Sequence, residues 1–196
     1  MNYGVGNLRS IRKGLEKSGA QVQITHNPTD LRSADAIVLP GVGAFAPAVK
    51  NMAHIADVVA EAMENGKPIL GVCLGLQLLF TRSSEGGSIK GLDFISGDVV
   101  KLPDSVKIPQ MGWNTIDFAR SHPLLDGIKN HSYVYFVHSY YPQPTDPDVI
   151  VTTSEYGVRF PSMVAKKNLF ATQFHPEKSS KTGLTMLKNF VGIVKR

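Results

Sequence analysis

Cysteine is nearly absent from the sequence: Cys73 is the only one among 196 residues. A single cysteine cannot form a disulfide within the chain, which is typical of proteins from a reducing compartment. The chain has no apolar run approaching the ~20 residues of a membrane-spanning helix, and its first residues lack a signal-peptide pattern. We therefore expect a cytoplasmic protein with no membrane association.

Clusters of one charge and nucleotide-binding motifs are missing as well. The net charge is +5, but lysine and arginine are spread along the chain, so we expect no nucleic-acid partner. The glycines at 4–6 and 40–43 do not complete a dinucleotide fingerprint, and there is no P-loop. No group of cysteine and histidine has zinc-ligand spacing. We expect neither a metal nor an organic cofactor.

What is present is the composition of an ordinary globular protein. Hydrophobic residues make up 42% and charged residues 19% of the chain, and the length suits one domain, residues 1–196, with its own core. The first half alternates between short apolar runs and segments in which apolar residues recur at helical spacing. The runs predict strands at 22–24, 36–39 and 68–70, and the helical segments predict helices at 7–19 (capped by Asn7) and 45–64. This alternation indicates parallel strands with helices on both faces of the sheet.

The second half has a different pattern after Gly86–Gly87. Turns rich in proline, glycine and aspartate, notably 142–147, separate runs of β-forming residues. These runs predict strands at 98–100, 133–137, 149–152 and 169–174, followed by an amphipathic helix at 180–194. The fold class is therefore α/β, with an open, mostly parallel sheet and an antiparallel, β-rich C-terminal part.

Cys73 lies where the strand at 68–70 is expected to turn into a helix carrying apolar residues at 76–80. Gly71 and Gly75 leave room for a sharp turn and for a bound molecule to approach closely. A thiol at a helix N-terminus is favoured as the thiolate, which is the form that acts as a nucleophile. The alternative is that Cys73 is an inert, buried, small hydrophobic residue.

His175-Pro176-Glu177 follows the last expected strand. A cysteine nucleophile needs a base, and the base needs a group that orients it. His175 supplies an imidazole, and Glu177 can fix its tautomer across the rigid proline. Since both His175 and Cys73 follow strand ends, they are expected at the same edge of the sheet. The alternative is a surface histidine, with Glu177 capping the next helix.

Pro40-Gly41-Val42-Gly43 also follows an expected strand. Two glycines on such a turn can direct backbone N–H groups at an oxyanion. They can equally form a tight turn chosen for its shape, or bind a phosphate.

Three segments, 40–43, 71–77 and 174–177, together resemble the oxyanion strand, nucleophile elbow and His-Pro-Glu segment of the class I, triad-type glutamine amidotransferases. Further segments resemble the glutaminase subunits of imidazole glycerol phosphate synthases, and these are 3–8, 40–45, 111–114, 136–140 and 174–179. The resemblance covers essentially the whole chain. It implies a flavodoxin-like fold and hydrolysis of L-glutamine to glutamate and ammonia. It also implies a heterodimer with a (β/α)₈-barrel cyclase, which uses the ammonia in histidine biosynthesis.

The chemistry and the resemblance together assign a role to each candidate residue. The catalytic residues are Cys73 as nucleophile, His175 as base and Glu177 as its orienting partner. The oxyanion donors are the N–H groups of Val42, Gly43 and Leu74. By resemblance, glutamine is held by Gly43, Gln77, Ser139 and Tyr140, and the cyclase is contacted by Asn7, Trp113, Tyr135 and Lys178.

Other classes of function remain open. The chain could be the amidotransferase subunit of another synthase, or a different cysteine–histidine hydrolase, such as a peptidase, that releases no ammonia from glutamine. A non-catalytic interaction module is expected to have lost a member of the triad. Members of the resembled family usually begin with an apolar strand of about six residues, whereas only Met1-Asn2 precede Tyr3 here. We expect that the first strand is truncated, and that a chain starting at Met1 is poorly stable.

Overall fold

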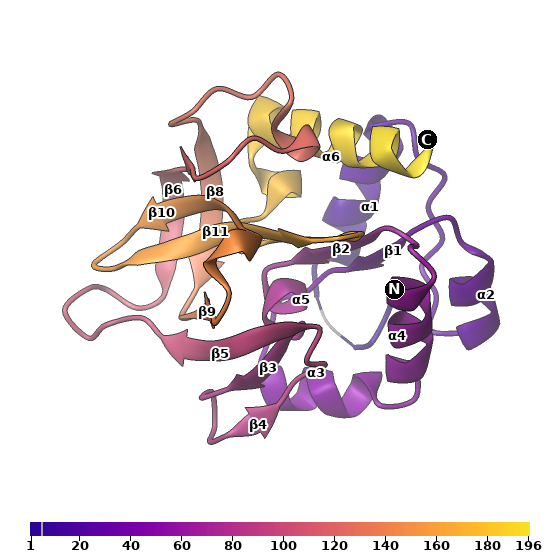
Figure 1. The fold of residues 1–196 in the computed structure, drawn as a ribbon, viewed down its shortest axis with the longest axis horizontal. Helices are drawn as coiled ribbons and strands as arrows, with labels where there is room; N and C mark the ends of the chain where they lie inside the picture. The colour runs from indigo at the N-terminus through magenta and orange to yellow at the C-terminus, as the bar shows by residue number, and fades with distance from the viewer. Residues whose placement is uncertain (5) are drawn as a thin grey trace.

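The computed structural model describes residues 1–4 and 6–196, and Figure 1 shows its arrangement. The helices are α1 (Leu8–Lys17), α2 (Pro28–Ser33), α3 (Phe45–Met52), α4 (Ala56–Glu64), α5 (Leu74–Gln77) and α6 (Ser180–Val194). Short 3₁₀ turns are η1 (Pro123–Leu125), η2 (Pro147–Val149) and η3 (Pro176–Lys178). The strands are β1 (Ile37–Leu39), β2 (Ile69–Val72), β3 (Phe80–Ser83), β4 (Ile89–Lys90), β5 (Ile95–Lys101), β6 (Gln110–Thr115), β7 (Asp117–Phe118), β8 (Tyr133–His138), β9 (Tyr140–Pro144), β10 (Ile150–Glu155), β11 (Arg159–Lys166) and β12 (Leu169–Thr172).

The largest sheet has six strands in the order β1-β2-β12-β11-β10-β7. The strands β1, β2 and β12 are parallel to one another, and the remaining pairs are antiparallel. A four-stranded sheet (β4-β3-β5-β9) and a two-stranded sheet (β6-β8) complete the C-terminal part. The predicted α/β class, with parallel strands first and an antiparallel part later, is confirmed. The largest sheet is mixed and not mostly parallel as predicted, because three of its five strand pairs are antiparallel.

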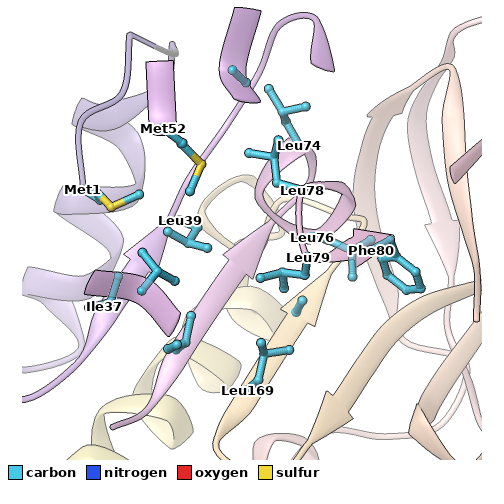
Figure 2. Close-up of a cluster of buried hydrophobic side chains, with 14 of the residues drawn as sticks. Met1, Ile37, Leu39, Met52, Leu74, Leu76, Leu78, Leu79, Phe80 and Leu169 are labelled. Carbon is cyan, nitrogen blue, oxygen red and sulfur yellow. The ribbon is translucent and has the colours of Figure 1, made fainter. Parts of the chain in front are cut away.

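Both faces of the parallel strands are covered, as expected for strands without alternating polar residues. Along β2, Ile69 belongs to one buried cluster and Leu70 to the other, because successive side chains point to opposite faces. The first cluster packs under α3, α4 and α5, and Figure 2 shows part of it, with Leu39, Met52 and Leu74 converging. The second cluster lies under α1 and α6, which flank the other face in Figure 1. The loops that carry the candidate site residues therefore start from strands that are packed on both faces.

The predicted helix at 45–64 is two helices. α3 ends at Met52 and α4 begins at Ala56, with a turn between them in which the Ile55 N–H donates to the Met52 carbonyl at 2.9 Å. The buried side chains keep helical spacing across the turn, at Phe45, Ala48, Met52, Ile55, Val59 and Ala62. The apolar pattern continues through the break and therefore cannot reveal it.

The prediction that 142–147 is only a turn is also wrong in part. β9 includes Pro142 and Pro144, and it pairs with β5 so that Val99 lies opposite Pro142. β9 is the edge strand of its sheet, and an edge strand tolerates proline, which has no N–H to donate.

The predicted strand at 22–24 does not form. The Asn2 N–H donates to the Thr25 carbonyl at 2.7 Å, and the Met1 amino group donates to the Val38 carbonyl of β1 at 3.0 Å. Between residues 21–25 and β1 lies a cavity of about 1140 Å³. Within residues 1–4 and 6–196, no strand pairs with the outer edge of β1. A run of β-forming residues needs a hydrogen-bonded neighbour to become a strand, and residues 22–24 have none there.

Candidate active site

Cys73 occupies the sharp turn between β2 and α5, with φ 53° and ψ −104°. A positive φ is rare for a residue other than glycine and is often found at functional sites. The positions that flank Cys73 have room only for glycine. A Cβ on Gly75 would lie 1.8 Å from the Leu39 carbonyl oxygen, and a Cβ on Gly71 would lie 2.9 Å from the Gly75 carbonyl oxygen. The expected strand–turn–helix is therefore present.

The helix after Cys73 is shorter than predicted. α5 ends at Gln77, and β3 begins at Phe80. The apolar residues at 76–80 are buried on every side, which a single helical face does not require. A one-turn helix has a small dipole, so the environment of the Cys73 sulfur depends mainly on neighbouring side chains.

Strand pairing brings the two chemical segments together. β12 is parallel to β2, with Thr172 beside Val72, and the Cys73 N–H donates to the Thr172 carbonyl at 2.7 Å. His175 lies three residues beyond the end of β12, so it shares the carboxyl edge of the sheet with Cys73, as the sequence predicts.

His175 and Glu177 form a buried pair. His175 Nδ1 lies 2.8 Å from Glu177 Oε1, and both side chains are fully buried. Burial by itself lowers the pKa of His175, but the neighbouring Cys73 side chain and the hydrogen-bonded Glu177 carboxylate outweigh it and raise the pKa to about 9. No described residue forms a hydrogen bond with His175 Nε2. The carboxylate therefore fixes one ring nitrogen and leaves the other for proton transfer.

Asn7 does not act as the predicted helix cap. It stands at the N-cap position of α1 with φ 71°, but its side chain makes no capping hydrogen bond. Instead, Asn7 Nδ2 donates to Glu177 Oε1. A second donor to this carboxylate helps to hold it against His175.

The predicted oxyanion turn lies beside the cysteine. Val42, Gly43, Cys73 and Leu74 all line a cavity of about 230 Å³. Gly43 has φ 135°, a conformation that a side chain would strain. The Leu74 N–H donates to the Gly41 carbonyl at 3.4 Å. This N–H is therefore weakly bonded within the protein, and a better acceptor can replace the carbonyl.

Tyr3 anchors the start of this turn. Its hydroxyl donates to the Pro40 carbonyl and is buried. Burial raises the pKa of Tyr3, and the charge of Cys73 adds to the effect. The phenol is therefore a neutral donor that holds the segment leading to Val42 and Gly43.

The predicted glutamine-binding residues line the same cavity. Gly43, Gln77, Ser139 and Tyr140 all contribute to its wall. Gln77 Nε2 donates to the Tyr140 carbonyl at 2.9 Å. The volume equals the share of roughly eight water molecules in the liquid, which suits a small polar molecule such as one amino acid.

Sequence reasoning missed Gln173 and Ser179. Gln173 Nε2 lies 3.6 Å from Cys73 Sγ. Ser179 Oγ donates to the His175 carbonyl at 2.6 Å and accepts from the Tyr135 N–H at 2.9 Å, which ties the histidine segment to β8. Gln173 follows the end of β12 and lies 100 residues from Cys73 in the chain, so no periodic pattern in the sequence points to it.

Three of the four predicted partner-contact residues form one exposed surface. The rings of Trp113 and Tyr135 have centroids 5.9 Å apart, and Lys178 Nζ lies 5.8 Å from the Tyr135 ring centroid. Trp113 is 52% exposed, and its neighbours Met111 and Tyr133 are 65% and 62% exposed. The fourth, Asn7, donates to Glu177, the residue before Lys178.

Two further findings concern other classes of site. Within residues 1–4 and 6–196, no group of three or more His, Cys, Asp and Glu side chains is arranged to hold a metal ion. None of the helices described above has the length and hydrophobicity needed to cross a membrane.

Comparison with known families identifies the chain's relatives. The family model for class I glutamine amidotransferases matches residues 1–193. The chain belongs to the class I glutamine amidotransferase family. This amidotransferase is 51% identical to the imidazole glycerol phosphate synthase subunit HisH of Archaeoglobus fulgidus, over 100% of the chain and 98% of the relative. It is 48% identical to the HisH subunit of Methanocaldococcus jannaschii, over 99% of the chain and 98% of the relative.

Solved structures show the same fold at lower identity. A crystal structure of a glutamine amidotransferase has a TM-score of 0.77 at 17% identity, with 98% of this chain and 96% of that chain covered. The glutaminase domain of Trypanosoma brucei CTPS, with bound acivicin, has a TM-score of 0.69 at 15% identity, with 97% and 91% covered.

Proposed function

We propose that this amidotransferase hydrolyses glutamine as a subunit of an imidazole glycerol phosphate synthase in histidine biosynthesis. Its HisH relatives match it over essentially their full length, and the site contains the residue types that the reaction needs. The ammonia would pass to a cyclase subunit with a (β/α)₈-barrel fold, in which it becomes part of the imidazole product.

The observation that carries this proposal is the state of His175. Its Nδ1 is held by Glu177, its Nε2 has no partner among the described residues, and Cys73 is close enough to raise its pKa. Because the pKa of His175 is about 9, Nε2 takes the thiol proton before the attack. The thiolate then attacks the amide carbon of glutamine, and Nε2 gives the proton to the departing ammonia. Water then attacks the thioester, with His175 again taking a proton, and glutamate is released.

The oxyanion of each tetrahedral intermediate needs donors at the cavity wall. We assign this role to the N–H groups of Val42, Gly43 and Leu74, of which the Leu74 N–H must leave the Gly41 carbonyl. Removing one such donor typically costs about 3–4 kcal/mol of barrier. Gln77, Ser139 and Tyr140 line the rest of the cavity and are assigned to the amino-acid end of glutamine.

The cyclase would dock on the surface formed by Trp113, Tyr135 and Lys178. Exposed aromatic residues beside a cation are enriched at the centre of protein interfaces. Lys178 follows Glu177 directly, so this surface lies next to the place where ammonia forms.

The test compares wild type with Cys73→Ser, each in complex with the cognate cyclase. With glutamine as nitrogen source, we expect the variant to lose essentially all product formation, because a serine hydroxyl is not ionised at neutral pH. With ammonium instead of glutamine, both complexes are expected to turn over equally. Glutamine-dependent turnover by the variant would contradict the assignment of Cys73, and a wild type that releases no ammonia from glutamine would contradict the function itself.

A further inference from the structure

A row of buried hydrogen bonds connects the Cys73 sulfur to the far wall of the cavity. Gln173 Nε2 donates to Cys73 Sγ at 3.6 Å. Gln173 Oε1 accepts from Gln77 Nε2 at 3.2 Å, and Gln77 Nε2 also donates to the Tyr140 carbonyl at 2.9 Å. Gln173 is fully buried and Gln77 is 5% exposed, so water does not compete for these bonds.

The carbonyl at the end of this row fixes the orientation of both amides. A backbone carbonyl can only accept, so Gln77 must present its NH₂ group to Tyr140. The same NH₂ group then faces Gln173, which must present its oxygen. The NH₂ group of Gln173 is therefore the one that faces Cys73.

The sulfur has two polar neighbours that respond in opposite ways when it loses its proton. As a thiol, Cys73 donates to the Val137 carbonyl at 3.6 Å. As a thiolate it can only accept, so it is repelled by the Val137 oxygen and attracted by the Gln173 N–H. Rotation of the Gln173 amide would break its bond to Gln77, so this donor is fixed in place before the reaction.

We propose that Gln173 is a positioning residue for the nucleophile, holding the Cys73 sulfur with a fixed N–H donor that favours its thiolate form. The proposal rests on the role of Cys73 in the proposed glutamine hydrolysis. Gln173 does not line the cavity of about 230 Å³, so it acts through Cys73 and not on the substrate.

Other titratable groups also face the sulfur and must stay constant in a test. His175 and Tyr3 both interact with the charge of Cys73. Glu177 lies behind His175, and Glu85 and His138 lie on the cavity wall. Variants at position 173 leave all of these groups unchanged.

The test uses alkylation by iodoacetamide, which reports on one site because Cys73 is the only cysteine. The pH dependence of the alkylation rate is measured for wild type, Gln173→Leu and Gln173→Glu. The leucine variant keeps the size of the side chain without a donor, and we expect about tenfold slower alkylation at neutral pH, with the midpoint about one pH unit higher. The glutamate variant places a second negative charge beside the sulfur, so its midpoint is expected to lie higher still.

Thr172→Val is the matched control. Thr172 is equally buried and directly precedes Gln173, at the end of β12, and its hydroxyl donates to the Phe174 carbonyl and not to the sulfur. Its alkylation profile should match wild type, although a buried hydrogen bond is lost. In the complex with the cyclase, Gln173→Leu should lower kcat for glutamine by about tenfold and change KM less than about twofold.

Two outcomes would overturn the proposal. One is a wild-type alkylation profile in Gln173→Leu or Gln173→Glu, whichever remains folded by circular dichroism. The other is an equal shift in Thr172→Val, which would mark a general packing effect. Because alkylation needs no glutamine, a failure of the proposed hydrolysis appears separately, as a reactive Cys73 in a protein that releases no ammonia.

Discussion

His138 and His175 are both buried, yet their environments shift their pKa values in opposite directions. Burial is the main cause that lowers the pKa of His138 to about 4, and the charge of His175 adds to it, against the hydrogen bond to the Tyr140 carbonyl. His175 has a partner carboxylate and a pKa of about 9. His138 is therefore neutral at pH 7, and its Nδ1–H holds the same carbonyl that Gln77 binds.

The two shifts predict how the free energy of unfolding depends on pH. The folded pKa of His138 is below its ordinary value of 6.5, so the unfolded chain takes up the proton first and stability falls as the pH drops from 6.5 through 4. The folded pKa of His175 is above 6.5, so its contribution is present below pH 6.5 and is lost as the pH rises through 9.

The acid part of this dependence can be tested with His138→Gln. We expect the variant to be less stable than wild type at neutral pH. Between pH 6.5 and 4, however, its free energy of unfolding should fall by roughly 3 kcal/mol less than that of wild type. Urea unfolding across this pH range measures the difference. Parallel curves for the two proteins would show that His138 is not the group that titrates.

At the scale of elements, the sequence predicts what apolar periodicity and strand ends can encode. β1, β2, β8, β12, α1 and α6 lie where expected, and Cys73 and His175 follow neighbouring strand ends. The break between α3 and α4 is invisible because the buried positions keep helical spacing across it. The bonds from Asn7 to Glu177 and from Gln173 to Cys73 join residues far apart in the chain, so only the tertiary structure reveals them.

The turn after β1 is held by a side chain from the beginning of the chain, and this gives a second prediction. Tyr3→Phe removes the hydroxyl that donates to the Pro40 carbonyl. We expect a loss of about 1 kcal/mol in the free energy of unfolding, and a lower kcat for glutamine because the oxyanion donors that follow are less well fixed.

The control for this change is Tyr156→Phe. The Tyr156 hydroxyl donates to the Lys107 carbonyl at 2.9 Å in an exposed position, so its loss should leave kcat unchanged. Urea unfolding and glutamine kinetics in the complex measure both effects. An unchanged kcat in Tyr3→Phe would show that the turn keeps its geometry without this hydrogen bond.

At the scale of the whole molecule, the two ends of the six-stranded sheet differ. β7 is a two-residue strand at one end, and the outer edge of β1 borders the cavity of about 1140 Å³ at the other. The Met1 amino group lies at this cavity, and burial lowers its pKa to about 6. The parallel strands next to Cys73 are therefore packed on both faces, while no strand within residues 1–4 and 6–196 pairs with the outer edge of β1. That the family's first strand is truncated here stays a prediction.

The exposed surface on β6 and β8 has an optical consequence. Trp113 is the only tryptophan in the chain. Excitation at wavelengths that tryptophan alone absorbs therefore reports on a single indole, which lies on the proposed docking surface. Because Trp113 is 52% exposed, its emission should be that of a hydrated indole in the free subunit and should move to shorter wavelength when the cyclase covers it. A titration against a cyclase whose own tryptophans are replaced by phenylalanine would give the affinity without any label. An emission spectrum that stays constant while the complex forms would place the cyclase on another face.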